Sequence, residues 1–216
     1  MTYSIVARDA ETGEVGVAVQ TGTFGVGRVV QWARPNVGAV ATQSFSEKSY
    51  GPLGLELMAG GKSAEQALAA LLAADPGQAF RQAAMIDASG RAAVHTGSSC
   101  VAAAGHHVGE GYSVQANMMA SERVWPAMAE AYEAAQGTLA RRLLAALDAA
   151  EAAGGDFRAR QSAALLVVPG EPDALPWAVV SDLRVDDHPE PLAELRRLLE
   201  LEEAYRLLSS PETATP

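Results

Sequence analysis

Residues 2–21 of the chain read TYSIVARDAETGEVGVAVQT. A β-branched segment at 2–8 is followed by turn residues at 10–13 and by a second segment, 14–20, in which valine recurs at every second position. Alternation with period two is typical of a β-strand, and a short glycine-containing connection between two such segments is typical of a hairpin. The sequence therefore predicts a β-hairpin that starts at the second residue of the chain.

Downstream of this hairpin, the pattern of apolar residues predicts strands and helices that arrive in groups. The clearest helix start is Ser63-Ala64-Glu65-Gln66, because a serine followed three residues later by glutamine is a capping-box sequence. The glycine-rich segment 101–111 is interpreted as a loop. The other predicted elements are strands at 29–33, 37–43, 82–87, 91–96, 112–116, 162–168 and 177–185, and helices at 53–58, 63–72, 121–135, 138–153 and 191–208.

This order does not alternate one strand with one helix, which disfavours doubly wound and barrel folds. Paired helices between groups of antiparallel strands favour an α+β domain in which two sheets stack face to face, with a helix pair outside each sheet. A single domain is predicted over residues 1–208. The polar segment 209–216, which contains two prolines, is predicted to be a flexible tail.

The composition limits the classes of partner. The 216 residues include 16 Lys+Arg and 26 Asp+Glu, a net charge of −10, which argues against nucleic acid or an anionic membrane as the main partner. The N-terminus has no secretory signal pattern, and no stretch approaches the roughly 20 apolar residues of a membrane span. One cysteine, Cys100, excludes an intramolecular disulfide. These features favour a cytoplasmic protein.

Several segments, in the right order, resemble the bacterial and archaeal family called domain of unknown function 1028. Their residues are 2–21, 32–43, 50–61, 95–100, 109–120, 160–168 and 182–201. The resemblance implies the four-layer αββα sandwich of the N-terminal-nucleophile (Ntn) hydrolases. It supplies no reaction, because the activity of that family is unsettled.

Thr2 is the first candidate for chemistry under this resemblance. Removal of Met1, which a small second residue permits, would leave a free α-amine beside the Thr2 hydroxyl, and the amine can take the hydroxyl proton. Main-chain N–H groups near Gln43 and Ser44, at the end of a predicted strand, are the candidate donors to an oxyanion. The alternative is that Thr2 simply begins a strand. Two features favour it: the segment 29–33 has no lysine, and Gln20 stands where proteasome-like relatives carry an aspartate.

Six other residues are candidate contacts to a substrate. Amide side chains at strand ends can bind a carboxamide or carboxylate, and a Cys–His pair can form a thiolate nucleophile. No spacing typical of a metal site accompanies the histidines, so no metal site is predicted. The candidate contacts are Gln20, Arg28, His95, Cys100, Gln115 and Asn117.

The leading hypothesis is a cofactor-independent hydrolase that cleaves an amide bond of a small or peptide-like substrate, with Thr2 as nucleophile. The second is a non-catalytic domain that binds a small ligand or forms a homo-oligomer, in which the apolar helix at 191–208 is a plausible homodimer element. The third is a hydrolase dependent on Cys100, which requires His95 or His106 within hydrogen-bond reach of the sulfur.

Overall fold

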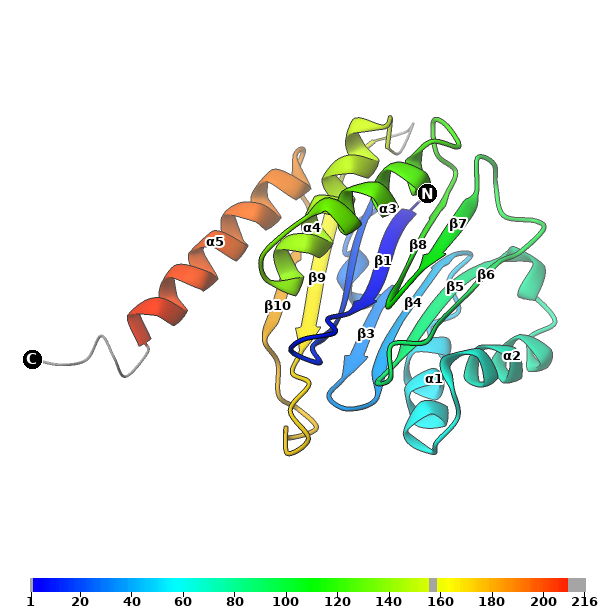
Figure 1. The fold of residues 1–216 in the computed structure, drawn as a ribbon. Coiled ribbons are helices and arrows are strands. Elements are labelled where there is room, and N and C mark those ends of the chain that lie inside the picture. The colour runs from blue at the N-terminus through cyan, green and yellow to red at the C-terminus, as the bar shows by residue number, and fades with distance from the viewer. Residues whose placement is uncertain (1, 156–158, 210–216) are drawn as a thin grey trace, which may run out of the picture.

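The computed structural model describes residues 2–155 and 159–209, which form two antiparallel sheets and five α-helices (Figure 1). Sheet A has the strand order β10-β9-β2-β1-β8-β7, and sheet B has the order β3-β4-β5-β6. The strands are β1 Thr2–Arg8, β2 Val15–Thr21, β3 Gln31–Arg34, β4 Gly38–Ser44, β5 Arg81–Asp87, β6 Ala92–Thr96, β7 Gly105–Gly109, β8 Tyr112–Asn117, β9 Ser162–Val168 and β10 Ser181–Val185. The helices are α1 Tyr50–Ala59, α2 Ala64–Ala74, α3 Val124–Ala134, α4 Leu139–Ala152 and α5 Pro191–Ser209, with short 3-10 turns at Val26–Arg28 and Gln78–Phe80.

The opening hairpin forms as predicted, and β1 becomes a central strand of sheet A, paired with β2 on one side and β8 on the other. Its alternation assigns each side chain to one of two apolar clusters. Val6 and the β2 valines pack against Ala39, Ala41 and Ile86 of sheet B. Tyr3 and Ile5 point the other way, toward α3 and α4. A strand that buries both faces reads as apolar throughout, as this one does.

The helices lie against the sheets in two groups (Figure 1). Leu143 and Leu147 of α4 share a cluster with β1, β8 and β9, and α3 and α5 contribute to the same cluster. Tyr50 of α1 and Leu68 of α2 pack with Met85 of sheet B in a separate cluster. The predicted α+β class is confirmed. Within the described ranges, no helix combines the length and the apolar character needed to cross a bilayer.

The capping box at the start of α2 is confirmed in its side-chain detail. The Ser63 hydroxyl accepts from the Gln66 main-chain N–H at 3.2 Å, and the Ser63 N–H donates to Gln66 Oε1 at 3.1 Å. These two bonds satisfy N–H groups that a helix start otherwise leaves without a partner.

Two of the predicted elements are corrected by the structure. Residues 105–109, predicted as part of a loop, form strand β7, which pairs with β8 through the two-residue turn Glu110-Gly111. Gly109 lies against the Tyr112 ring, and a Cβ atom at this position would be only 2.1 Å from Cε1. The absence of a side chain at residue 109 therefore lets β7 and β8 pair in this hairpin. Strand β10 starts at Ser181 instead of residue 177, because Leu175–Ala178 forms a turn with proline in its second position.

The predicted tail at 209–216 meets the structure only at its first residue. Ser209 is the last residue of α5, and residues 210–216 lie outside the described residues.

Candidate functional site

Thr2 lies where several strand ends meet. In sheet A it is paired with Thr21 at the end of β2 and with Asn117 at the end of β8. Only 7% of Thr2 is exposed, and its hydroxyl donates to the Thr21 hydroxyl at 3.1 Å. The end of β4, which carries Gln43, faces this point from sheet B.

Four buried amide side chains surround the Thr2 main chain. They are Gln43, Gln82, Gln115 and Asn117, each at most 1% exposed, and we call them the amide cluster. The Thr2 carbonyl accepts from Gln43 Nε2 at 3.2 Å and from Asn117 Nδ2 at 3.3 Å. Both of these nitrogens also lie within hydrogen-bond distance of Gln82 Oε1, at 2.7 and 2.9 Å. The first residue of β1 is therefore held by amides from both sheets.

Ser4 extends the cluster one step along β1. Its hydroxyl donates to Gln43 Oε1 at 2.7 Å and accepts from Gln115 Nε2 at 2.6 Å. Thr2 and Ser4 are two residues apart, so both point toward sheet B, as period two requires. Buried polar groups of this kind are tolerated because they are hydrogen-bonded, and a connected network fixes the relative position of the elements that it joins.

Gln82 is the residue of this cluster that the sequence interpretation missed. Its Nε2 lies within hydrogen-bond distance of Thr96 Oγ1 at 2.9 Å, Ala116 O at 2.9 Å and Gly105 O at 3.1 Å. One side chain thus contacts β6, β7 and β8 as well as its amide neighbours. A polar residue at an inward-facing position of a strand that is otherwise apolar is the signal that would have identified it.

The end of β4 turns sharply at Ser44, which adopts a left-handed conformation with φ of 68°. Just beyond it, the Phe45 N–H donates to Phe80 O at 3.3 Å, and Phe45 O accepts from Arg81 Nη1 at 2.7 Å. Gln43 and Ser44 therefore occupy the strand end beside Thr2, where the sequence suggested an oxyanion site. The Gln43 side chain contacts Thr2, because its Nε2 donates to the Thr2 carbonyl.

An ion pair holds this strand end in place. Arg81 Nε donates to Asp75 Oδ2 at 2.7 Å, and Asp75 also accepts from the Gly77 N–H and from the Tyr50 hydroxyl. The hydrogen bond from Arg81, aided by those from Gly77 and Tyr50, lowers the pKa of Asp75 to about 2 against the opposing effect of burial. Because Arg81 also binds the Phe45 carbonyl, the pair positions the segment that follows Ser44.

We expect the Asp75→Asn variant to lose less free energy of unfolding than the wild type as the pH is lowered. A carboxyl whose pKa is depressed in the folded state contributes stability above its unfolded pKa, near 3.8, and loses it as the pH falls toward about 2. Urea unfolding at a series of pH values should show the wild type losing its advantage over the variant across that interval. Asp173→Asn, in an exposed loop position, is the control and should follow the wild type. Parallel curves for wild type and Asp75→Asn would contradict the assignment.

Four predicted contacts lie apart from the amide cluster. Gln20 donates to Glu151 Oε2 at 3.1 Å, on the helix side of sheet A, where the Tyr3 hydroxyl binds the same oxygen. Arg28 is exposed and lies over the Phe24 ring, 5.2 Å from its centroid. His95 Nε2 contacts Gln78 O at 2.9 Å. The fourth is Cys100.

Cys100 donates from Sγ to Arg81 O at 3.3 Å. Among the described residues, neither His95 nor His106 is hydrogen-bonded to this sulfur: His95 binds Gln78, and His106 Nδ1 lies 2.8 Å from Thr96 Oγ1. The pairing that a Cys100-dependent hydrolase requires is therefore not formed. Within the same described ranges, no three His, Cys, Asp or Glu side chains gather as a metal site would need.

The chain is similar to a family model and to solved structures of other proteins. A family model described as a family of unknown function, DUF1028, matches residues 2–195. The solved structure of protein SPO2555 from Silicibacter pomeroyi, described with the same family model, is 35% identical, has a TM-score of 0.83, and the match covers 99% of this chain and 91% of that chain. Anbu (ancestral β-subunit) from Yersinia bercovieri is 10% identical with a TM-score of 0.41, and the match covers 97% of this chain and 98% of that chain. No curated protein matches the chain.

Proposed function

Because the chain belongs to the DUF1028 family, whose function is unknown, we propose an activity from its own residues: a cofactor-independent N-terminal-nucleophile hydrolase. Its substrate is an amide bond in a small or peptide-like molecule. Thr2 is the nucleophile once Met1 has been removed. The observation that carries the proposal is the position of Thr2, at the start of a central strand and held by amide side chains from both sheets.

The proposed reaction uses the α-amine of Thr2 as its base. The amine takes the proton from Oγ1, directly or through a water molecule, and Oγ1 attacks the substrate carbonyl carbon. N–H groups at the end of β4, near Gln43 and Ser44, stabilise the tetrahedral oxyanion. The C–N bond then breaks, and the ammonium returns its proton to the leaving amine. Water, activated by the same amine, hydrolyses the ester on Thr2 and frees the carboxylic acid.

The arrangement of the apolar clusters supports the same proposal. One cluster joins the two sheets, one joins sheet A to α3, α4 and α5, and one joins sheet B to α1 and α2. We interpret this order as the αββα sandwich of Ntn hydrolases. In that interpretation, the strand end that carries Thr2 is the catalytic edge of the two sheets.

A non-catalytic, ligand-binding or homo-oligomeric protein is the second candidate, and one observation favours it. Among the described residues, the hydrogen bonds of the Thr2 hydroxyl and carbonyl are made with neutral side chains, those of Thr21, Gln43 and Asn117. Neither a lysine nor a carboxylate joins them. In the hydrolase proposal the α-amine must therefore supply the base alone, which makes its release from Met1 decisive.

The intact mass of the protein from its natural producer separates the two candidates. We expect a mass lower than that of the full sequence by one methionine, because threonine is small enough for Met1 to be removed. The Thr2→Leu variant, whose second side chain is large, supplies the reference mass with Met1 retained. If the natural protein keeps Met1, the α-amine lies on the wrong residue and the Thr2 mechanism is excluded.

A further inference from the structure

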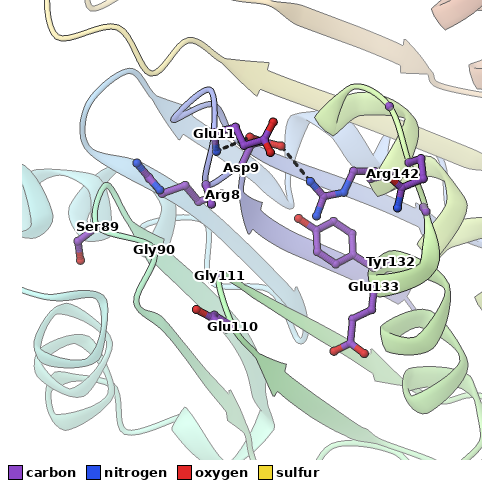
Figure 2. Close-up of a pocket in the computed structure, with 14 residues that line it drawn as sticks. Arg8, Asp9, Glu11, Ser89, Gly90, Glu110, Gly111, Tyr132, Glu133 and Arg142 are labelled. Atoms are coloured by element: carbon purple, nitrogen blue, oxygen red, sulfur yellow. Dashed lines mark hydrogen bonds and ion pairs between the residues drawn. The ribbon is translucent and has the colours of Figure 1, made fainter.

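A cleft of about 770 Å³ opens at the end of β1 opposite to Thr2 (Figure 2). Thr2 and Arg8 are the first and last residues of the seven-residue strand β1, about 20 Å apart, and the cleft and the amide cluster share no residue. The turn after β1, the turn between β7 and β8, and the connection from α3 to α4 form its walls. The seven side chains that matter for its chemistry are Arg8, Asp9, Glu11, Glu110, Tyr132, Glu133 and Arg142.

In one wall of the cleft, the charges of Arg142 and Asp9 neutralise each other. Arg142 Nη1 donates to Asp9 Oδ2 at 2.9 Å, and the Arg142 guanidinium lies over the Tyr132 ring, 4.6 Å from its centroid. Asp9 also accepts main-chain hydrogen bonds from Glu11 and Thr12. The charge of Arg142 is thus balanced inside the wall.

Tyr132 supplies an unused donor to this wall. The residue is only 3% exposed, and within the described part of the chain its hydroxyl has no hydrogen-bond partner. Figure 2 shows the hydroxyl pointing from α3 into the space beside Arg8 and Asp9. Burial raises the pKa of Tyr132 to about 12, so the hydroxyl keeps its proton at neutral pH. A buried hydroxyl without a partner is uncommon in folded proteins.

Arg8 supplies an unused cation. Its main-chain N–H is fixed to Gly111 O at 2.8 Å, but its guanidinium makes no hydrogen bond or ion pair with the described residues. A guanidinium whose backbone is fixed and whose N–H groups are unpaired can bind a carboxylate through two parallel hydrogen bonds.

The acidic side chains of the cleft outnumber this cation. Glu11 and Glu110 are exposed, and neither carboxylate has a partner in the described ranges. Glu133 accepts from the Tyr112 hydroxyl at 2.6 Å and adds a third negative charge at the rim. With Arg142 balanced by Asp9, the free charges are one positive and three negative.

We propose that this cleft binds a free basic α-amino acid, a small molecule with one carboxylate and two cationic amino groups. The Arg8 guanidinium takes the carboxylate, and the buried Tyr132 hydroxyl joins it once the ligand displaces the side chains that cover that oxygen. Glu11, Glu110 and Glu133 surround the two amino groups. A simple anion would meet a surplus of negative charge, and a simple diamine would leave Arg8 unpaired, so neither uses the whole set of groups. This proposal is independent of hydrolysis at Thr2.

Titration calorimetry of the full chain with L-lysine tests the proposal. Two probes lack one half of the ligand: glutarate has no amino group, and cadaverine has no carboxylate. We expect lysine to bind at least about tenfold more tightly than either, because each lost charged hydrogen bond contributes that much. Arg8→Gln should weaken the binding of lysine by a similar factor and should not weaken that of cadaverine, which has no carboxylate and is repelled by the arginine. Tyr132→Phe should weaken lysine without changing any charge.

The controls separate local from general effects. Arg123→Gln removes an exposed arginine at the opposite end of α3 and should leave lysine binding unchanged. Glu110→Gln should weaken both lysine and cadaverine, and Glu122→Gln, an exposed position outside the cleft, is its matched control. Lysine bound equally by wild type, Arg8→Gln and Tyr132→Phe overturns the proposal, as does the absence of heat from every probe. A wild-type dimer that Arg8→Gln or Glu110→Gln dissociates, seen by sedimentation, also overturns it, because the cleft would then be a contact between copies.

Discussion

Thr2→Ala should abolish amide hydrolysis. Loss of a catalytic nucleophile lowers kcat by about 10³-fold or more, because little but binding and oxyanion stabilisation remains. Alanine is small, so Met1 removal and the free α-amine are preserved in the variant. Only the hydroxyl oxygen that attacks the substrate is lost. Release of a fluorescent amine from a panel of acylated peptides provides the measurement.

Two further variants make this result specific. Thr2→Ser keeps a hydroxyl and an amine on the same residue and should retain measurable hydrolysis. Thr12→Ala changes an exposed threonine at the far end of sheet A and should behave as the wild type. A β-lactone supplies a readout without a known substrate, because Oγ1 opens the ring and retains the whole reagent as an ester. Hydrolysis or labelling that survives in Thr2→Ala would show that another residue attacks.

Gln82→Leu should destabilise the fold by about 3–5 kcal/mol, because several buried polar groups lose their partner at once. The exchange keeps the approximate size of the side chain but removes both of its polar ends. Gln43, Asn117 and the Ala116 carbonyl each lose a hydrogen bond in a buried site, and the Gly105 carbonyl loses one in a half-buried position. Urea unfolding should show a lower midpoint at an unchanged slope.

Gln136→Leu is the matched control for this variant. Gln136 is exposed in the connection from α3 to α4, and its substitution should change the free energy of unfolding by no more than about 0.5 kcal/mol. Equal midpoints for the two variants would mean that the hydrogen bonds of Gln82 contribute no net stability. A changed slope for Gln82→Leu would instead indicate an altered denatured or native state.

The sequence was most informative where local chemistry alone decides the structure. The alternating valines of β2 and the capping box at Ser63 determine their elements without help from distant residues. Strand β7 was missed because GHHVG contains a single strong strand former, and its pairing depends on contact between Gly109 and the Tyr112 ring. The start of β10 was misplaced because Trp177 and Val179 suit a strand, yet Pro176 directs the chain into a turn.

The candidate site was predictable only in part, because its residues come from five strands, β1, β2, β4, β5 and β8, most of which are far apart in sequence. Thr2 was identified as a candidate nucleophile, Gln43 through its main-chain N–H, and Gln115 and Asn117 as amide side chains at a strand end. The structure brings these four together. Gln20 was an equally good candidate by that criterion. It faces the helices because it lies one position before Thr21, and a shift of one residue reverses the face of a strand. Whether Gln20 or Thr21 faces sheet B depends on the strand register, which could not be derived from the sequence.

Strand β1 separates the amide cluster from the charged cleft. Thr2 stands at one end and Arg8 at the other, and changes separated by more than about 10 Å without shared partners combine additively. Within the family, selection can therefore alter the amide-bonded end and conserve the charged cleft, or the reverse. Under the two proposals, a chain that lost Thr2 would still fold and still bind its ligand at the cleft.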